Sequence, residues 1–401
     1  MSGYLFILGN TPELAFAELS VCYPNVQKIS PDVAYTSDLI DPNQAILRLG
    51  GVVKIAQVVT ETDKIDSAAF VQIFQELPEL RFTFGISSYT ADVVITHTML
   101  DTVKDELTTL GKHPRFVEAK HEGELSSVVI TKQSLTELVV AKHNSHWFIG
   151  KTVAVQDFQE WGRRDFGRPF CDPKAGMLPP KVARMMVNLA SDGFVIPAPE
   201  PGSSVRKEWI PGQARNDIKL VLLDPFCGMG TVLGEALLTG WKVLGSDLSS
   251  EVIGKAEKNL RWLEGSDTSN FTLMVADATQ ISQQIPPASV DAIVTEPFMG
   301  NTQMSSNNYH PISNDHIKNT IKGLEKLYIG CLKDWQTVLK SGGLVVITFP
   351  KYCMNGREFF VKKVIDRCEN LGYTIRQGPI EYCRPLAVVK REIFIFQYGT
   401  H

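Results

Sequence analysis

The feature that most constrains this chain is its glycine-rich segment at residues 218–230, which reads IKLVLLDPFCGMG. Val221–Leu223 is an apolar run too short for a helix, and it predicts a buried strand. The strand ends at Asp224, because the proline that follows cannot continue a central strand. Gly228 and Gly230 then allow the backbone to turn tightly and to approach a ligand without an intervening side chain. The segment therefore predicts a strand followed by a ligand-binding turn.

The residues after this turn, 231–238, predict a helix. The unpaired N–H groups and the positive dipole end of that helix point back into the turn, which suits a carboxylate or a phosphate. Taken alone, the same pattern also fits an ordinary glycine-rich connection between a strand and a helix. The strands that follow in the sequence favour the ligand-binding interpretation.

Two of these later strands are followed by acidic residues. Lys242–Ser246 predicts a second strand that leads into Asp247. An acidic residue about 20 positions after a glycine turn, at the end of the next strand, is the arrangement that binds two ribose hydroxyls. A third strand, Phe271–Val275, leads into Asp277 and Ala278. The Asp277 carboxylate can accept a hydrogen bond from an adenine amino group.

A fourth predicted strand, Val290–Thr295, runs into the sequence EPFMG at residues 296–300. Four strand ends with polar residues, separated by helix-length segments, describe one edge of a parallel α/β sheet, where a ligand is expected. An NAD site stays open in principle. However, the turn lacks the G-x-G-x-x-G spacing, and one nucleoside-sized crevice fits better than a dinucleotide.

These segments carry a resemblance to a known family. Residues 224–231, DPFCGMGT, resemble the S-adenosylmethionine loop of class I methyltransferases, in the version used by RNA and DNA amino-group methylases. Residues 295–298, TEPF, resemble the Asp/Asn-Pro-Pro-aromatic catalytic motif of those enzymes. The resemblance implies that S-adenosylmethionine is the cofactor, with its methionine part along the glycines, its ribose at the first acidic residue and its adenine at the second. The implied cofactor-binding residues are Asp224, Phe226, Gly228, Gly230, Thr231, Asp247, Asp277 and Ala278.

The catalytic segment also departs from the family pattern, because Glu296 replaces Asp or Asn and the second proline is missing. An exocyclic amine is a poor nucleophile, and acceptors placed on its N–H bonds help to aim its lone pair at the methyl group. We assign this task to the Glu296 carboxylate and the Pro297 carbonyl, with Phe298 or Met299 packed on the base. The base has to leave its stack to reach such a pocket. Glu296 as an ordinary strand-end carboxylate is the alternative.

The front half predicts a small α+β arrangement. A strand at Tyr4–Leu8 is followed by a helix from Pro12. Two stretches, Phe84–Tyr89 and Ile149–Asp157, resemble the THUMP-type RNA-binding region of tRNA methyltransferases, which here follows a ferredoxin-like unit. Further predicted elements are strands at 46–49, 52–59, 82–87, 115–119 and 127–130, a helix at 97–110 and a hairpin formed by 137–142 and 147–155.

The segment Trp161–Ala190 connects the two halves and is rich in arginine. A similar Arg-Asp, Arg-Pro and Pro-x-x-Ala-Arg run leads into the catalytic domain of tRNA guanine-N2 methyltransferases. Its cations can contact RNA, or they can pair with the acidic residues Asp157, Glu160 and Asp165. A second charged stretch, Lys112–His121, can contact phosphates or form a solvated face. The predicted RNA contacts in the connecting segment are Arg163, Arg164, Arg168, Lys181 and Arg184.

Near the C-terminus, residues 317–340 and 358–371 predict helices and residues 342–349 and 373–376 predict strands. The final strand, at residues 392–397, is expected to be antiparallel, as in class I methyltransferases. The overall prediction is an α/β class I methyltransferase with a seven-stranded sheet, preceded by the α+β RNA-binding region. The predicted divisions are a ferredoxin-like unit (1–55), a THUMP-like domain (56–157), a connecting helix with an irregular linker (158–217) and the methyltransferase domain (218–401).

Composition excludes several classes of protein. Hydrophobic residues make up 44% of the 401 residues and charged residues 21%, which is ordinary for a soluble protein of two or three domains. No segment resembles a membrane span or a signal peptide. The seven cysteines contain no C-x-x-C pair, so neither a disulfide framework nor a metal site is predicted, and we expect a reducing cytoplasm. A net charge of −4 argues against indiscriminate coating of nucleic acid.

Together with the resemblance, these features imply a cytoplasmic S-adenosylmethionine-dependent enzyme that methylates the N2 of a guanine in tRNA, at position ten. The expected partner is tRNA, and the chain is expected to act as a monomer, with or without an activating protein. The alternatives are an rRNA guanine-N2 methyltransferase, a DNA adenine-N6 methyltransferase and an RNA-binding homologue with weakened activity. The THUMP-like front half argues against DNA as the substrate.

Overall fold

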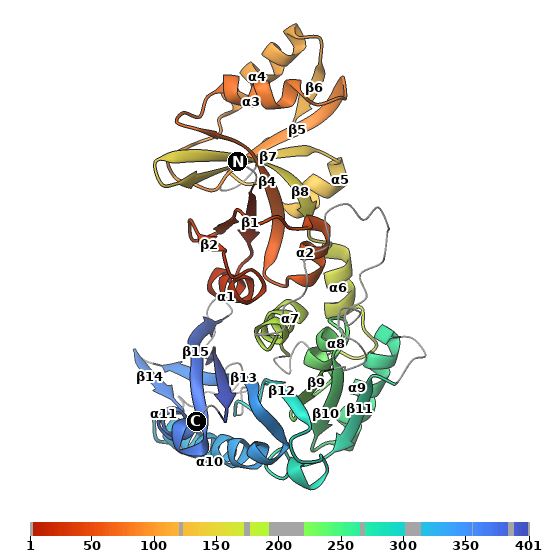
Figure 1. Ribbon diagram of the computed structural model, residues 1–401, viewed down its shortest axis with the longest axis vertical. Helices are drawn as coiled ribbons and strands as arrows, with labels where there is room; N and C mark the ends of the chain where they lie inside the picture. Colours follow the sequence, from red (N-terminus) through yellow and green to blue (C-terminus); the bar gives the residue numbers. More distant parts are fainter. Residues whose placement is uncertain are drawn as a thin grey trace, which may run out of the picture. The chain divides into compact units, whose positions relative to one another are not determined.

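The chain folds into two compact units (Figure 1), one with the described residues up to Glu160 and the other with those from Trp161 onward. Within the ranges that the structure describes, every helix is too short or too polar to cross a membrane. The computed structural model describes residues 3–119, 123–171, 177–191, 220–264, 269–300, 314–354, 356–383 and 389–399.

The first unit is built on one mixed sheet with the strand order β2-β3-β1-β4-β8-β7-β5-β6. The long strands β4 and β8 pair with each other and join the two ends of this sheet. The proposed boundary between residues 55 and 56 therefore falls inside β4. In chain order, the elements are β1 (Tyr4–Leu8), α1 (Pro12–Cys22), β2 (Gln27–Lys28), β3 (Val33–Thr36), α2 (Pro42–Arg48), β4 (Val52–Thr62), α3 (Ser67–Gln75), β5 (Arg81–Ser88), α4 (His97–Thr109), β6 (His113–Phe116), α5 (Ser127–Gln133), β7 (Thr136–His143), β8 (His146–Val155) and the first residues of α6 (Phe158–Phe166).

Two strands predicted in this unit are helices. Residues 46–49 lie mostly in α2, where the Asp41 side chain accepts hydrogen bonds from the backbone N–H groups of Asn43 and Gln44. Residues 127–130 lie in α5, where the Ser126 hydroxyl accepts from the N–H of Val129 at 3.3 Å. Side-chain capping satisfies N–H groups at the start of a helix, and here it prevails over the β-like composition of the apolar run.

The second unit contains a seven-stranded path, β11-β10-β9-β12-β13-β16-β15, and β14 adds to it by pairing with β13. Strands β9 to β13 run parallel to one another, whereas β14 and β16 are antiparallel to β13, and β15 is antiparallel to β16. The predicted antiparallel final strand is confirmed, and β14 adds an eighth strand to the predicted seven. In chain order, the elements are α7 (Pro180–Leu189), β9 (Val221–Asp224), α8 (Thr231–Leu237), β10 (Lys242–Asp247), α9 (Ser250–Glu264), β11 (Phe271–Val275), η2 (Ile281–Gln283), β12 (Val290–Thr295), α10 (Asn314–Val338), β13 (Leu339–Met354), β14 (Arg357–Phe360), α11 (Lys362–Cys368), η4 (Glu369–Leu371), β15 (Tyr373–Tyr382) and β16 (Val389–Tyr398).

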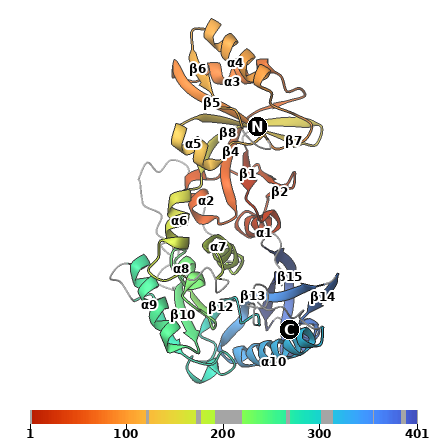
Figure 2. The ribbon, with the colours of Figure 1, turned by 180° about the vertical axis from the view of Figure 1, so that it is seen from behind.

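Helices cover both faces of this second sheet (Figure 2). Ile347 and Phe349 of β13 belong to the hydrophobic cluster that includes α10. Thr348, between them, faces the other way, and its hydroxyl lies 3.6 Å from the sulfur of Met186 on α7. Because successive side chains of a strand point to opposite faces, α7 and α10 lie on opposite sides of β13. The central parallel strands β9, β12 and β13 are largely buried on both faces, as apolar runs predict. Strand β11, at the edge of the sheet, is partly exposed.

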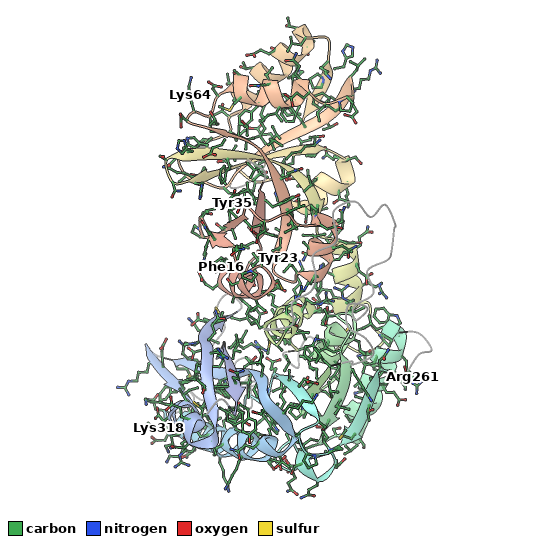
Figure 3. The ribbon with its side chains drawn as sticks, viewed as in Figure 1. Phe16, Tyr23, Tyr35, Lys64, Arg261 and Lys318 are labelled. Atoms are coloured by element: carbon green, nitrogen blue, oxygen red, sulfur yellow. The ribbon has the colours of Figure 1, made fainter. Side chains whose placement is uncertain are left out.

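The exposed helix faces carry local ion pairs. Arg261 of α9 pairs with Glu257 at 2.6 Å, and Lys318 of α10 pairs with Asp315 at 3.3 Å (Figure 3). Pairs of this kind contribute about 0–1 kcal/mol each. The stability of the unit therefore depends mainly on the clusters between sheet and helices. The predicted helix at 358–371 begins only at Lys362, with α11 followed by η4, because residues 357–360 form β14.

Candidate active site

The glycine-rich segment forms a tight turn between β9 and α8. Gly228 has φ +50° and Gly230 has φ +83°, a backbone region that favours glycine. A Cβ on Gly228 would meet no atom within 4 Å, whereas one on Gly230 would make ordinary contacts with Leu260 and Ala256. Backbone conformation therefore requires both glycines, and the turn is open beside Gly228. This open, side-chain-free backbone fits a ligand that approaches closely.

Asn259 of α9 supports the outer part of this turn. Its side-chain amide donates to the backbone carbonyl of Met229 at 3.0 Å and to that of Phe170 at 2.9 Å. Asn259 is 5% exposed, and a buried amide of this kind is expected to be hydrogen-bonded. The sequence analysis missed this residue, although an asparagine between the buried Ala256 and Leu260 of one helix could have indicated it.

Asp224, at the end of β9, points into the protein and is 2% exposed. Its Oδ1 accepts a hydrogen bond from the Thr295 hydroxyl at 2.7 Å and another from the Phe226 N–H at 3.1 Å. Burial raises the pKa of Asp224 to about 7, and the nearby carboxylates of Asp247 and Glu296 act in the same direction. The contact with Thr295 joins the ends of β9 and β12, so Asp224 holds together the edge where the predicted ligand groups lie.

The two acidic residues assigned to the nucleoside lie where the sequence placed them. Asp247 is the last residue of β10, and its Oδ1 accepts from the N–H of Ser249 at 2.9 Å. Asp277 follows β11, and its Oδ1 accepts from both the N–H and the hydroxyl of Thr279 at 2.8 Å. Both are partly exposed. Strands β10 and β11 are adjacent and parallel, so these carboxylates follow neighbouring strand ends.

The other predicted cofactor residues have mainly packing roles among the described residues. Phe226 is half-buried and packs against the main hydrophobic cluster of the unit. Ala278 is buried, and its carbonyl accepts from the indole N–H of Trp335 at 3.0 Å. The hydroxyl of Thr231, the first residue of α8, accepts from Arg168 at 2.8 Å. All three residues therefore have packing or hydrogen-bond partners within the second unit.

Glu296 follows β12 and contacts an arginine from the last strand. The Nε–H of Arg391 donates to Glu296 Oε1, and the two side chains are 15% and 17% exposed. The two residues are 95 positions apart in the sequence. Sequence analysis missed Arg391, because no local pattern links a strand of apolar character to the end of β12.

Two tyrosines hold the backbone that follows Glu296. The Tyr328 hydroxyl donates to the carbonyl of Phe298 at 2.6 Å, and the Tyr352 hydroxyl donates to the carbonyl of Met299. Burial raises the pKa of Tyr352, which keeps its hydroxyl protonated as a donor. A Cβ on Gly300 would collide with that same hydroxyl.

Of the two candidates for packing on a base, Phe298 is 58% exposed and Met299 is 8% exposed. Pro297 is buried. An aromatic ring that stands in solvent beside a carboxylate can stack on a planar ligand, whereas a buried methionine is already used in packing. The structure therefore favours Phe298 over Met299 as the side chain available to a base.

The arginines of the connecting segment gather around a buried glutamate of α8. Arg164 Nε lies 2.8 Å from Glu235 Oε1, and Arg184 Nη2 lies 2.7 Å from Glu235 Oε2. The side chains of these three residues are between 3% and 10% exposed. The Arg164 guanidinium also lies 4.0 Å from the centre of the Trp161 ring. We call these four residues the Glu235 cluster.

This arrangement corrects part of the sequence-based expectation. Arg164, Arg168 and Arg184 are used inside the second unit, so direct RNA contact by them is not retained; buried cations need a partner. Glu235 is a partner of both Arg164 and Arg184. Arg163 is exposed, with its guanidinium 4.4 Å from the centre of the Trp262 ring. Burial lowers the pKa of Lys181, which is only partly exposed.

The second charged stretch is only partly described. The Lys112 ammonium donates to the backbone carbonyls of Leu77 and Glu79, so this lysine is not positioned to contact phosphate. His113 and Arg115 are exposed. Lys120 and His121 lie outside the described residues, as does the predicted linker 191–216 except for Ser191.

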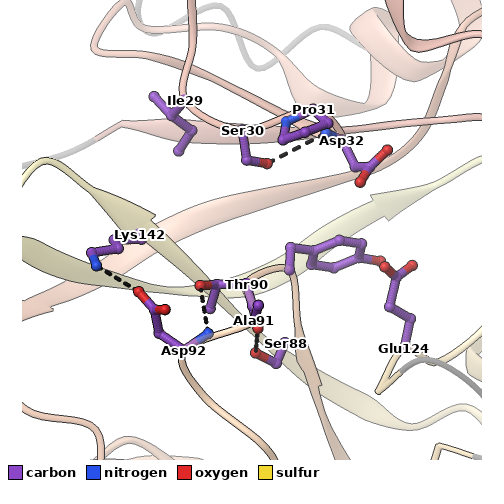
Figure 4. A pocket seen from close by; sticks show the side chains of 11 residues that line it. Ile29, Ser30, Pro31, Asp32, Ser88, Thr90, Ala91, Asp92, Glu124 and Lys142 are labelled. Atoms are coloured by element: carbon purple, nitrogen blue, oxygen red, sulfur yellow. Dashed lines mark hydrogen bonds and ion pairs between the residues drawn. The ribbon is translucent and has the colours of Figure 1, made fainter.

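The first unit has a cavity of about 540 Å³ (Figure 4). Its polar lining residues bond with one another: the Lys142 ammonium lies 2.5 Å from Asp92, and the Ser88 hydroxyl donates to the carbonyl of Thr90 at 3.3 Å. Asp32 and Glu124 give it an acidic character. A cluster of acidic groups does not identify a ligand by itself, and we assign no function to this cavity.

Comparison with known proteins bears on the fold first. The structure is similar over 99% of the chain to the whole of TrmN from Thermus thermophilus, with a TM-score of 0.53 and 17% sequence identity. It is similar over its whole length to 99% of a proposed methyltransferase solved in complex with SAH, with a TM-score of 0.50 and 11% identity. The fold is that of the class I methyltransferases. The prediction of an α/β class I methyltransferase fold is thereby confirmed.

Sequence comparison agrees with this fold. A family model described as an RMKL-like methyltransferase domain matches residues 213–311. The chain is 31% identical over 195 residues to a tRNA (guanine(10)-N2)-dimethyltransferase of Pyrococcus abyssi, a match that covers 49% of the chain and 44% of that protein. It is 28% identical over 210 residues to the enzyme of the same name from Methanothermobacter thermautotrophicus, covering 52% and 49%. The chain thus spans about half the length of these curated relatives.

Proposed function

We propose that this chain transfers a methyl group from S-adenosylmethionine to the exocyclic N2 of a guanine in tRNA, at position ten. The observation that carries the proposal is the Glu296 carboxylate at the end of β12, linked through Thr295 and Asp224 to the glycine turn. An acceptor for an amine N–H and a cofactor turn therefore belong to the same edge of the sheet. The activity named for the relatives supports this choice of substrate.

The cofactor contacts follow from the chemistry of the groups at this edge. Gly228 and Gly230 offer close backbone approach to the methionine part, and the helix N-terminus behind them favours its carboxylate. Asp247 can accept from two ribose hydroxyls and Asp277 from the adenine amino group. Phe226, Thr231 and Ala278 form the proposed walls. Asp224 is assigned to support of the turn, because its buried Oδ1 already accepts from Thr295.

S-adenosylmethionine, when bound, would supply an electrophilic methyl group: the sulfur–methyl bond would break as the nitrogen–carbon bond forms, leaving a thioether, and one N–H proton would be lost to water. Glu296 and the Pro297 carbonyl accept the amine N–H groups and so aim the nitrogen lone pair. Phe298 stacks on the extruded base. The tyrosines that hold the carbonyls of Phe298 and Met299 keep this segment in place.

We assign tRNA binding to the first unit, with a ferredoxin-like region at 1–55 and a THUMP-like region at 56–157. The proposed compartment is a reducing cytoplasm. Arg163 and Lys181 remain the proposed cationic contacts of the connecting region (158–217), which leads into the methyltransferase domain (218–401). Removal of residues 1–157 should abolish methylation of tRNA while preserving cofactor binding. Binding of tRNA by the full chain should weaken as salt rises, because phosphate contacts release counterions.

The deciding experiment is mass spectrometry of nucleosides from tRNA incubated with the purified chain and S-adenosylmethionine labelled in its methyl group. Label on guanine N2, lost when position ten of the transcript is changed to adenine, is the expected result. Activity of the purified chain alone would also show that no activating protein is required. Label on adenine, or label on rRNA only, would overturn the proposed substrate. Cofactor binding without any methylation would favour an RNA-binding homologue.

A further inference from the structure

Arg391 and Glu296 approach each other across two strands of the sheet. Thr295, just before Glu296, is in register with Ile347 of β13. Arg391 of β16 is in register with Pro350 of the same strand. The Arg391 side chain therefore crosses the end of β13 to donate to Glu296 Oε1. Both side chains are largely shielded from water, at 15% and 17% exposed.

Arg391 is itself held in place by the neighbouring strand. It lies directly opposite Tyr382 of β15. Its guanidinium carbon is 5.8 Å from the centre of the Tyr382 ring, within the range of a cation–π contact. Tyr382 is 7% exposed. A guanidinium fixed between a buried ring and a carboxylate can define the orientation of that carboxylate.

A glutamate needs such a partner more than an aspartate does, since its side chain has one more rotatable bond. Ordering that extra bond costs entropy, and a charge-assisted hydrogen bond to a fixed guanidinium offsets the cost. A carboxylate offers about four lone-pair positions, so acceptance from Arg391 does not by itself exclude acceptance from a substrate amine. The contact is therefore compatible with the proposed role of Glu296.

We propose that Arg391 is a positioning residue, which holds the longer Glu296 side chain so that its carboxylate meets the amine of the target base. This rests on the proposed function, because it assigns Arg391 a role only through Glu296. Two other roles give different results in an experiment. As a phosphate contact, Arg391 would contribute to tRNA affinity and its salt dependence. As a purely structural residue, it would contribute to stability alone.

The experiment compares Arg391→Gln and Arg391→Lys with the matched control Lys390→Gln in the full-length protein. Lys390 is the next residue of the same strand, points to the other face, and pairs with Glu381 at 2.9 Å. For Arg391→Gln, kcat should fall by about tenfold to a hundredfold, the scale expected when a reacting group is displaced by about 1 Å. The KM for tRNA and the cofactor affinity should hardly change. Lys390→Gln should retain wild-type kcat.

A double variant separates positioning from the other roles. If Arg391 acts through Glu296, then Arg391→Gln should cause no further loss in a Glu296→Gln background. Guanidinium added below denaturing concentration should partly restore kcat to Arg391→Ala. The proposal would be overturned if the two substitutions lowered kcat multiplicatively in the double variant. It would also be overturned if Arg391→Gln raised the KM for tRNA and reduced the salt dependence of tRNA binding.

The failure of this proposal differs from the failure of the proposed function. Wild-type kcat in Arg391→Gln, measured beside an active wild type, overturns the positioning role and leaves the proposed function standing. A wild type that methylates no RNA overturns the proposed function and the positioning role with it. The positioning role would also be overturned if kcat fell only in proportion to the folded fraction of the variant, as measured by unfolding.

Discussion

Glu235 and Glu296 both pair with arginines in the second unit, but their surroundings differ. Glu235 lies between Arg164 and Arg184, and all three side chains are at most 10% exposed. Glu296 and Arg391 are 17% and 15% exposed, at the end of a strand. A buried carboxylate between two arginines balances their charges inside the protein. A carboxylate that retains access to solvent can also meet a ligand. Burial, rather than the pairing itself, separates a structural glutamate from a catalytic candidate.

The most disruptive test of this comparison is Glu235→Gln. The variant keeps the size of the side chain but removes the negative charge that the two buried guanidinium groups share. We expect the free energy of unfolding to fall by about 3–5 kcal/mol, as when one partner of a buried pair is removed. Urea denaturation measures it. The control Glu257→Gln, which removes an exposed pair with Arg261, should cost less than about 1 kcal/mol. Equal losses would contradict a stabilising role for the Glu235 cluster.

Asp224 extends the comparison to a buried carboxyl group whose hydrogen-bond donor is the Thr295 hydroxyl instead of an arginine. Its pKa is raised from 3.8 to about 7 in the folded chain, so folding favours the protonated form. The stability of the wild type should therefore fall as pH rises from about 4 to about 7 and stay level above that range. The total loss is at most about 4 kcal/mol.

In Asp224→Asn this source of pH dependence is absent, and the amide oxygen can still accept from Thr295. Relative to the wild type, the variant should therefore gain stability as the pH rises from 5 to 7.5, a range that includes the raised pKa of Asp224. Urea unfolding of both proteins at the two pH values measures this difference. A constant difference between the proteins would show that Asp224 does not titrate in this range.

Glu296→Gln tests the other side of the comparison. Turnover on tRNA should fall by about a hundredfold or more, the scale of losing one preorganised polar partner of a transition state. The free energy of unfolding should fall by less than in Glu235→Gln, because Glu296 is more exposed than Glu235. Glu296→Asp keeps the charge with a shorter reach and should have intermediate activity. Wild-type turnover in both variants would refute the catalytic role.

The smallest effect on stability is expected at Asp247, which forms no ion pair with an arginine of the described residues and accepts from the N–H of Ser249. Asp247→Ala should remove the proposed ribose hydrogen bonds and weaken cofactor binding by about 1.5–3 kcal/mol per bond at most. Calorimetry with the full-length protein measures it. Stability should change little, because Asp247 is partly exposed. Unchanged affinity would mean that the ribose assignment is wrong.

Local patterns in the sequence were enough to predict much of the second unit. The apolar runs at β9, β10, β11 and β12, with acidic residues or glycines after them, specified the sheet edge and the glycine turn. Strand and helix periods are properties of neighbouring residues, so a single segment can reveal them. The same reasoning failed at α2 and α5. There, the capping residues Asp41 and Ser126 decided between helix and strand.

The tertiary structure alone decided which charged groups meet. Arg164 and Glu235 are 71 positions apart, and Arg391 and Glu296 are 95 apart. The first contact depends on how the connecting segment folds back onto α8, and the second on the order and register of β12, β13 and β16. The sequence by itself determined the sheet, its ligand-binding edge and Glu296 as a candidate. It left open which arginines are buried and which one reaches that carboxylate, because burial depends on packing between residues distant in the chain.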